Sequence, residues 1–292
     1  MQIPAQSSVA KMRIAVLITS HNRVATTVRC LEALLTNRDS EFELKPFVVD
    51  DGSTDGTSTT ISHQFPSVHL VQGSGMLYWS KGMNLAWQTA LEETFDAYLW
   101  LNDDVVLFPD AVRTLVQTYK DFNHHSGSDC IVVGCLTDPD SGIYTYGVGM
   151  RDSNWHPGRG RMLEPSPEKA VEAESFHGNV VLVPHSVVEK IGIIDSVFSH
   201  AMGDTDYSLR AAKAGVKILA APGFVGTCPF NTATPKNLRE VMGRKFVPPK
   251  DWWIFTRRHS GTFSWPIAFL SPYVGSIIPR SLRNALRPKS KL

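Results

Sequence analysis

Adjacent carboxylates follow an apolar run near the middle of the first half of the chain. The residues Tyr98 to Leu101 are bulky and apolar enough to form a buried strand, and Asn102, Asp103 and Asp104 come directly after it. Two neighbouring carboxylates at the end of a buried strand repel each other, and each prefers to be solvated. A divalent cation shared with a phosphorylated ligand would resolve that conflict, because hard ions take carboxylate and phosphate oxygens together. The alternative is an acidic loop in which one Asp caps the next helix.

Two further acidic clusters lie far from this one in the sequence. Asp50 and Asp51 open a run that ends at Thr57, and its Asp, Ser and Gly residues are equally typical of a turn. Asp204 precedes a helical pattern in the second cluster. A carboxylate at such a place can take a proton from a substrate hydroxyl as a general base, or it can simply cap the helix.

The acidic clusters fall at one kind of position in the predicted fold. Strands are predicted over residues 12–19, 42–49, 68–71 and 98–101, with helices over 24–35, 57–64 and 81–94. This alternation predicts a parallel sheet with right-handed crossovers. Polar clusters at 19–22, 50–55, 73–75 and 102–104 each follow the carboxyl end of a strand. Ligands bind at that edge of open α/β sheets, so four clusters there predict a site.

The pattern changes in the second half of the chain. Residues 137–175 are rich in Gly, Pro, Asp and Arg, which predicts hairpins and a mobile loop. Within them, residues 151–161 are either a lid or acceptor loop or a plain surface loop. Further strands are predicted over 130–136, 176–183 and 216–220, and helices over 109–122, 184–191 and 207–214. The sequence becomes less regular after Pro222.

Composition and charge exclude some classes of protein. A formal charge of +1 provides no global field that would recruit nucleic acid. The four cysteines form no CxxC pair, so reduced thiols in the cytoplasm are expected. The first ten residues lack the layout of a signal peptide, and no apolar run is long enough to span a bilayer. We therefore expect a soluble cytoplasmic protein.

The last part of the chain combines an apolar stretch with basic residues. The stretch runs from Trp265 to Ile278 and is interrupted by two prolines. The basic residues that follow are Arg280, Arg283, Arg287, Lys289 and Lys291. This pairing predicts peripheral contact with the anionic inner face of the cell membrane. The alternative is a helical cap on the preceding domain with a solvated basic end.

Three motifs together carry a family resemblance. The run Val48 to Thr57, the triplet Asn102 to Asp104 and the run Gly203 to Asp206 resemble motifs of the family 2 glycosyltransferases, and the bacterial rhamnosyltransferase-like members look closest. The likeness extends from about Arg13 to Cys228. It implies an α/β GT-A fold, with a Rossmann-like, mostly parallel sheet flanked by helices. It also implies a catalytic domain over 11–228, with a nucleotide-sugar half (11–108) and an acceptor half (109–228), and a C-terminal helical or irregular extension over 229–292.

The resemblance implies roles for residues of the nucleotide-sugar half. Asp50 and Asp51 would read the nucleobase and ribose, which favours a UDP- or dTDP-sugar donor. Asp104 would bind Mg²⁺ or Mn²⁺, with Asp103 near the ribose or a metal-bound water. The remaining nucleotide contacts would come from Thr19, His21, Arg23, Gly75, Lys81 and Asn102. Asn102 stands where the family has Asp, so the triplet carries one charge fewer.

The resemblance also implies how the reaction proceeds. Asp204 would act as general base on the acceptor hydroxyl, and attack from the face opposite the leaving group would invert the anomeric carbon. Gly203 stands where a Glu usually precedes this base. Residues near the donor sugar or acceptor would be Trp79, Asn84, Gly178, Asn179 and Asp206. The acceptor would be a glycan or a lipid-linked saccharide in cell-surface polysaccharide synthesis, and the sugar a hexosyl or deoxyhexosyl group.

Other interpretations of the sequence remain open. Trp79 is nearly as well explained as a buried aromatic, and the glycines at 73–75 as a permissive turn. His177 and His200 are expected to be structural. A phosphatase of the haloacid dehalogenase type needs a different spacing of its aspartates, and a dehydrogenase needs a GxGxxG run that is absent. The serious rival is an inactive sugar-nucleotide-binding or scaffolding protein of the same fold, which Asn102 and Gly203 motivate.

Overall fold

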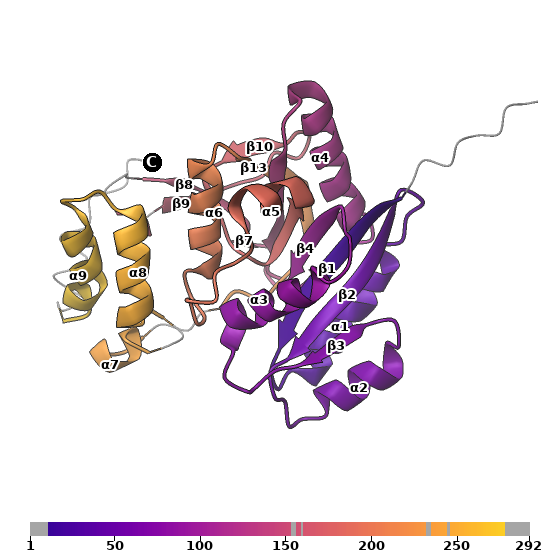
Figure 1. The fold of residues 1–292 in the computed structure, drawn as a ribbon, viewed down its shortest axis with the longest axis horizontal. Coiled ribbons are helices and arrows are strands. Elements are labelled where there is room, and N and C mark those ends of the chain that lie inside the picture. Colours follow the sequence, from indigo (N-terminus) through magenta and orange to yellow (C-terminus); the bar gives the residue numbers. More distant parts are fainter. Residues whose placement is uncertain (1–10, 153–155, 159, 232–234, 244–245, 278–292) are drawn as a thin grey trace, which may run out of the picture.

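A mixed sheet forms the centre of the molecule (Figure 1). This computed structural model describes residues 11–152, 156–158, 160–231, 235–243 and 246–277. The first elements are β1 (Met12–Ser20), α1 (Val24–Thr36), β2 (Phe42–Asp50), α2 (Thr57–Gln64), β3 (His69–Gln72), α3 (Tyr78–Ala90) and β4 (Ala97–Leu101). Strand β1 pairs in parallel with β2 and β4, and β2 pairs in parallel with β3. The carboxyl ends of these four strands therefore meet at one edge, as predicted.

The second half completes the sheet. Its elements are β5 (Val106–Leu107), α4 (Ala111–Ser126), β6 (Cys130–Thr137), β7 (Tyr144–Tyr146), β8 (Val148–Arg151), β9 (Gly160–Leu163), β10 (Val171–Ala173), β11 (Ser175–Phe176), β12 (Val180–Pro184), α5 (His185–Ile191), α6 (Gly203–Lys213) and β13 (Lys217–Thr227). The main path of the sheet has the order β10-β13-β6-β12-β4-β1-β2-β3. Strand β12 runs antiparallel to both β4 and β6. Its amino end therefore lies beside the carboxyl end of β4.

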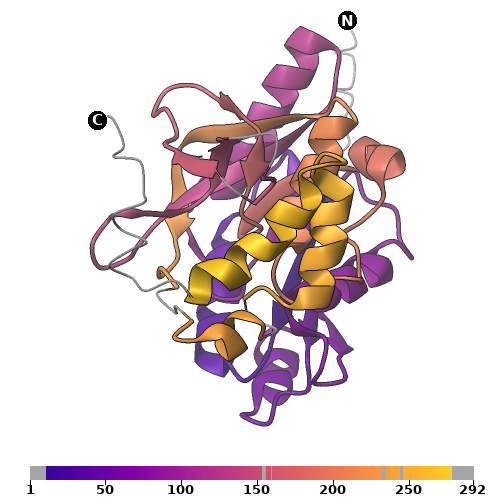
Figure 2. The same ribbon diagram turned by 90° about the vertical axis from the view of Figure 1, so that its left-hand side faces the viewer.

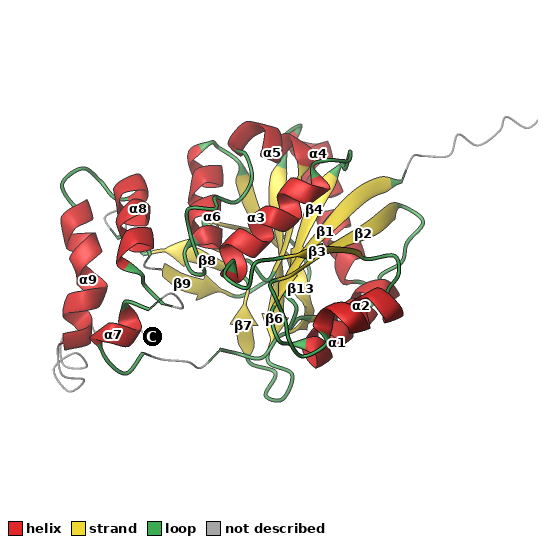
Figure 3. Ribbon diagram, turned by 60° about the horizontal axis from the view of Figure 1, so that its bottom comes forward, coloured by secondary structure: helices red, strands yellow, loops and turns green. Residues whose placement is uncertain are grey.

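Each face of the sheet contributes one layer of the core. In β1, Ile14, Val16 and Ile18 point to one side, while Ala15 and Leu17 point to the other. This alternation with both sides apolar is typical of a strand covered on both faces. Helices α1 and α2 cover one face, and α3 covers the other (Figure 3). The result is an α/β/α sandwich.

Two elements near the ligand-binding edge differ from the prediction. The apolar run predicted as one strand over 176–183 is divided into β11 and β12, because residues 177–179 leave the ladder. Helix α6 begins at Gly203, so Asp204 and Asp206 lie within its first turn and not before it. Both differences change which side chains reach the edge of the sheet.

The C-terminal extension is more regular than predicted. It contains α7 (Leu238–Val241), α8 (Pro249–His259) and α9 (Trp265–Ile277). Proline is well suited to the first turn of α8, because the amides there have no partner within the helix. Helix α8 joins α6 through a small apolar cluster of Phe198, Leu209, Trp252 and Phe255. Helices α8 and α9 lie next to each other on the outer side of the molecule (Figure 2).

Some sequence-based predictions fall on residues outside the described ranges. These are Trp155 and Arg159 of the predicted loop, and the basic residues Arg280, Arg283, Arg287, Lys289 and Lys291. No helix in the described part of the chain combines the length and apolar character that a membrane span requires.

Candidate active site

One cavity of about 640 Å³ opens at the carboxyl edge of the sheet. The predicted site residues that line it are Thr19, His21, Arg23, Asp51, Trp79, Asn102, Asp103, Asp104, Gly178, Asn179 and Asp204. Asp104 follows β4, whereas Asp204 lies in α6. The fold therefore brings the two carboxylates with the most important predicted roles to the same cavity.

Arg23 bridges the two carboxylates that follow β4. Its guanidinium donates to Asp103 Oδ1 at 2.9 Å and to Asp104 Oδ2 at 2.8 Å. Burial raises the pKa of Asp103 to about 6, even though the neighbouring Arg23 acts in the opposite direction. The side chain of Arg23 remains 44% exposed, whereas that of Asp103 is only 6% exposed. The cationic end of this pair is thus the one in contact with solvent.

Cys228 occupies the other side of Asp104. Its Sγ donates to Asp104 Oδ1 at 3.4 Å, and Asn179 Nδ2 donates to the same sulfur at 3.7 Å. Burial raises the pKa of the Cys228 thiol well above its ordinary value, and the charge of Asp104 adds to this effect. The raised pKa favours the neutral thiol, which donates to Asp104.

The donor set can be compared with what a divalent ion needs. No group of three or more His, Cys, Asp or Glu side chains within the described ranges could hold a metal ion. The Asp104 carboxylate lines the cavity and is 22% exposed. Mg²⁺ is commonly held by one or two carboxylates together with waters and substrate phosphates. The residues present therefore fit an ion that binds together with a diphosphate, and not one held by the protein alone.

Asn102 is held by Trp79. The indole Nε1 donates to Asn102 Oδ1 at 2.7 Å, and the backbone amide of Asn102 donates to the carbonyl of Asn179 at 3.0 Å. The ring of Trp79 also lies against Gly178, where an added Cβ would come within 2.5 Å of it. The side chain of Trp79 is thus half-buried and also forms part of the cavity wall. It therefore has features of both predictions, a buried aromatic residue and a residue of the binding site.

Asp204 is oriented by the segment between β11 and β12. The amide of Gly178 donates to Asp204 Oδ2 at 3.1 Å, and the amide of Thr205 donates to Oδ1 at 2.7 Å. A Cβ on the preceding Gly203 would lie 2.5 Å from Ser80 Oγ. The close contact between α3 and α6 therefore explains why glycine precedes Asp204, where the family resemblance implies a Glu.

The carboxylates of Asp50 and Asp51 accept hydrogen bonds from other groups of the protein. Asp51 accepts hydrogen bonds from the amides of Gly75, Leu77 and Tyr78, and Asp50 accepts them from Ser53 and Ser58. Asp50 is buried and is not among the residues that line the cavity. These contacts agree with the alternative interpretation of the cluster as a turn. A nucleobase contact by Asp51 stays a prediction.

Four other predicted residues do not line this cavity: Gly75, Lys81, Asn84 and Asp206. Gly75 adopts a φ of 79° in the turn around Asp51. Asn84 Nδ2 donates to the carbonyl of Ile194 at 2.6 Å. Asp206 is fully buried and is surrounded by cationic side chains, which excludes direct contact with a ligand in the cavity.

The cavity also contains residues to which the sequence assigned no ligand contact. His177 and His200 line it, although they were expected to be structural. Tyr146 and Asn231 line it as well, and the Asn231 amide donates to the Tyr146 hydroxyl at 2.9 Å. Both lie in stretches without apolar periodicity, so no local signal connected them with the site.

Comparisons with known proteins agree with this architecture. The model of glycosyl transferase family 2 matches residues 15–175. The structure of residues 1–349 of S. aureus TarS is similar with a TM-score of 0.57 and 12% identity, over 96% of this chain and 76% of that one. The complex of S. aureus TarS with UDP-GlcNAc is similar with a TM-score of 0.58 and 12% identity, over 94% of this chain and 70% of that one.

A third similar structure is that of a mannosyltransferase. The mannosyltransferase PcManGT from Pyrobaculum calidifontis, in complex with GDP-Man and Mn²⁺, is similar with a TM-score of 0.56 and 14% identity, over 96% of this chain and 77% of that one. At such identities the likeness establishes the fold alone. A search of curated protein sequences gives no match.

Proposed function

Because the chain belongs to glycosyl transferase family 2 and has its α/β GT-A fold, we propose that it is an inverting glycosyltransferase with a nucleotide-sugar donor. The single observation that carries this proposal is the shared cavity of Asp104 and Asp204. One carboxylate stands at the edge of the parallel strands, where a diphosphate would bind, and the other faces it from α6. We assign the nucleotide-sugar half to residues 11–108, the acceptor half to 109–228 and the extension to 229–292.

The donor side must neutralise charge on the leaving diphosphate. Asp104 would hold a divalent ion, Mg²⁺ or Mn²⁺, which supplies Lewis-acid stabilisation of that charge. Arg23 forms an ion pair with the same carboxylate, and it can turn toward the phosphates because its side chain is 44% exposed. The ligands of the similar structures, UDP-GlcNAc and GDP-Man with Mn²⁺, support a donor of this class. We propose a UDP- or dTDP-sugar that carries a hexosyl or deoxyhexosyl group.

The acceptor side must remove a proton. Asp204 takes it from the attacking hydroxyl, while the Gly178 amide keeps one carboxylate oxygen in place. A base of this kind contributes about 10²–10⁴-fold to the rate. Attack from the face opposite the diphosphate inverts the anomeric carbon, and no covalent intermediate is required. The half-buried ring of Trp79 would contact the donor sugar.

A transfer assay with matched variants tests the proposal. Thermal stability is first measured against UDP-, dTDP- and GDP-compounds with Mg²⁺ or Mn²⁺, because a ligand that binds only the native state raises the melting temperature. Asp204→Asn should then abolish transfer and leave the donor-induced shift unchanged. Asp140→Asn, a change of the same kind at an exposed turn, should alter neither. Unchanged transfer by Asp204→Asn would rule out this base.

The same experiment separates the enzyme from its rival. An inactive sugar-nucleotide-binding protein would show the donor-induced shift without transfer to any glycan or lipid-linked acceptor. Asn102 and Gly203 motivated that alternative, yet each has a local explanation in its contact with Trp79 or Ser80. We therefore favour the enzyme.

We further propose that the C-terminal helices contact the anionic inner face of a membrane, where a lipid-linked acceptor for polysaccharide synthesis would be found. The side chains of Phe263, Ile267, Leu270 and Val274 recur at helical spacing and are 51–93% exposed. From Trp252 onward the sequence holds seven Lys and Arg residues and no Asp or Glu. An apolar face beside basic residues favours anionic lipid surfaces.

Vesicle binding tests this contact. Ile267→Ser with Leu270→Ser should reduce sedimentation with anionic vesicles, and high salt should reduce it further. Ile143→Ser, at an equally exposed apolar side chain outside the C-terminal helices, serves as the control. Equal binding by the double variant and the control would contradict a membrane role for α9.

A further inference from the structure

The segment from Asp195 to Met202 forms one wall of the cavity without regular secondary structure. His200, Ala201 and Met202 line the cavity directly, and Asp204 follows in the first turn of α6. Met202 adopts a φ of 73°, which is unusual for a residue other than glycine. Such a conformation is strained and persists only where the surroundings support it. Two helices form contacts with this segment.

Helix α3 holds this segment from the donor side. The Ser80 amide donates to the carbonyl of Ser199 at 3.1 Å, and Ser80 Oγ donates to the carbonyl of His200 at 3.2 Å. Asn84 donates to the carbonyl of Ile194, the residue directly before this segment. These bonds connect the wall to a helix of the nucleotide-sugar half.

Helix α8 holds the same segment from the opposite side. The buried carboxylate of Asp251 accepts the Ser199 amide at 2.8 Å, and Arg258 forms an ion pair with Asp195 at 3.0 Å. Phe198 is completely buried in the cluster that α8 contributes, and Met202 packs against that cluster. Both ends of the wall are therefore attached to one helix of the C-terminal extension.

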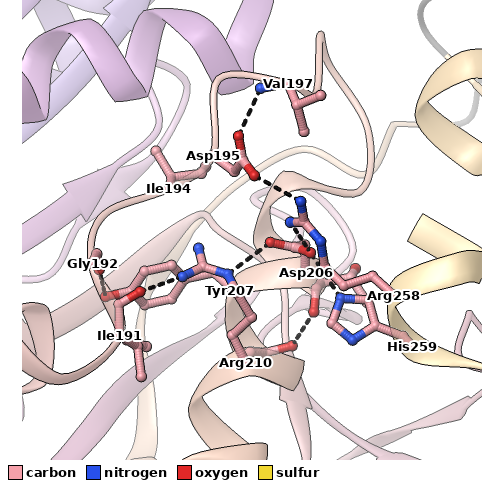
Figure 4. A network of polar contacts seen from close by, with 12 residues as sticks. Ile191, Gly192, Ile194, Asp195, Val197, Asp206, Tyr207, Arg210, Arg258 and His259 are labelled. Atoms are coloured by element: carbon pink, nitrogen blue, oxygen red, sulfur yellow. Dashed lines mark hydrogen bonds and ion pairs between the residues drawn. The ribbon is translucent and has the colours of Figure 1, made fainter. Parts of the chain in front are cut away.

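The same helix also fixes the first turn of α6 (Figure 4). Asp206 Oδ1 accepts hydrogen bonds from Arg258 and from His259 Nε2, each at 2.8 Å, and Oδ2 accepts one from Arg210 at 2.9 Å. Asp206 lies two residues after Asp204 in the same turn. The contacts from α8 therefore support the turn that carries Asp204.

We propose that Asp251 and Arg258 are positioning residues for the reaction: through Ser199, Asp195 and Asp206 they hold the cavity wall and Asp204 in the geometry that catalysis needs. The inference rests on the proposed function. It gives the extension a role that the family match, which ends at residue 175, does not include. Neither residue lines the cavity, so neither touches substrate.

The proposal predicts a specific division between binding and catalysis. The donor side of the cavity is built from the ends of β1, β2 and β4. Among the described residues, none of the hydrogen bonds and ion pairs of α8 reaches these strand ends. Loss of the α8 contacts should therefore lower kcat and raise the KM for the acceptor, while the Kd of the donor nucleotide stays constant. A displacement of about 1 Å at a reacting group can cost about 10²-fold in rate.

Two variants of α8 test this division. Arg258→Met removes both ion pairs, and Asp251→Asn weakens a single hydrogen bond in case the first variant fails to fold. We expect kcat to fall about 10²-fold for Arg258→Met, with partial recovery in Arg258→Lys, because lysine keeps the charge but cannot bond both carboxylates in one plane. Lys217→Met breaks an exposed ion pair with Glu172 and should leave kcat unchanged.

Hydrogen exchange provides a measurement that needs no turnover. Amides of residues 195–206 should exchange faster in both variants, while strands β1 and β4 keep their protection. If the variants exchange faster but the wild type transfers no sugar, the proposed function is wrong, while the support of the segment by α8 is confirmed. Wild-type exchange and wild-type kcat in a folded Arg258→Met or Asp251→Asn variant would overturn the positioning role.

Discussion

Asp204 shares a cavity with one cluster of aspartate and arginine and a helical turn with the aspartate of another, and the two clusters differ mainly in exposure. In the first, Arg23 is 44% exposed and pairs with Asp104, which is 22% exposed. In the second, Asp206 is 0% exposed and its partners Arg210 and Arg258 are 21% and 33% exposed. The first cluster lines the cavity, whereas Asp206 lies within the packing of α6 against α8.

This difference in exposure determines what each cluster can do. Exposed ion pairs contribute about 0–1 kcal/mol, so a ligand phosphate can replace Asp104 as the partner of Arg23 at little cost. Removal of one partner from a buried pair costs about 3–5 kcal/mol, because the other charge is left buried. The pair of Arg23 and Asp104 can therefore separate to bind a ligand, whereas the pairs of Asp206 with Arg210 and Arg258 support the fold.

The largest expected effect is on stability in the buried cluster. Asp206→Asn leaves Arg210 and Arg258 beside an uncharged amide, and we expect the free energy of unfolding in urea to fall by about 3–5 kcal/mol. Glu172→Gln, which breaks an exposed pair with Lys217, should change it by about 0–1 kcal/mol. Equal losses in the two variants would remove the distinction between the clusters.

The next effect concerns the divalent ion that Asp104 of the first cluster would bind. Thermal stabilisation by UDP or dTDP should increase when Mg²⁺ or Mn²⁺ is present, since the ion binds together with the diphosphate. Asp104→Asn should remove this increase and weaken nucleotide binding by about 10-fold, roughly 1.4 kcal/mol. An increase that survives in Asp104→Asn would place the ion elsewhere.

Arg23→Met should separate binding from stability. We expect weaker binding of the diphosphate and a loss in the free energy of unfolding smaller than that of Asp206→Asn, because Arg23 is 44% exposed although its partner Asp103 is 6% exposed. Calorimetry with UDP and urea unfolding of the same protein measure both quantities. A large loss of stability would show that Arg23 is structural like Arg258.

The smallest effect is a contrast in pH dependence. The pKa of Asp103 is raised to about 6 by burial, so its contribution to stability decreases as the pH rises from about 4 to 6. Burial also acts to raise the pKa of Asp206, but His259, Arg210 and Arg258 outweigh it and the pKa lies below its ordinary value. The Asp206 contribution is therefore present above about pH 4 and decreases as the pH falls further.

Carboxyl NMR titration of the two residues checks this contrast directly. The pKa of Asp103 should be near 6, and that of Asp206 should lie below the ordinary value of an aspartate. Similar midpoints for the two carboxyl groups would contradict the electrostatic difference between the clusters.

Local patterns predicted the first half of the fold well. Strands β1, β2 and β4 and helices α1 and α2 begin and end within about two residues of their predicted limits, because apolar periodicity and turn residues are local properties. The division between β11 and β12 was missed, although His177, Gly178 and Asn179 interrupt the apolar residues there. The limits of helices α8 and α9 within the predicted helical or irregular extension were not predicted, since their prolines and aromatic residues obscure the helical pattern.

The sequence alone determined that acidic residues would converge at the carboxyl edge of the sheet, because parallel strands place their ends together. Only the tertiary structure decided which of them face the cavity. Asp204 and Asp206 are two positions apart on one helical turn, and at 3.6 residues per turn they point about 200° apart. One side chain therefore reaches the cavity while the other is buried against α8, and that outcome depends on a helix more than forty residues further along the chain.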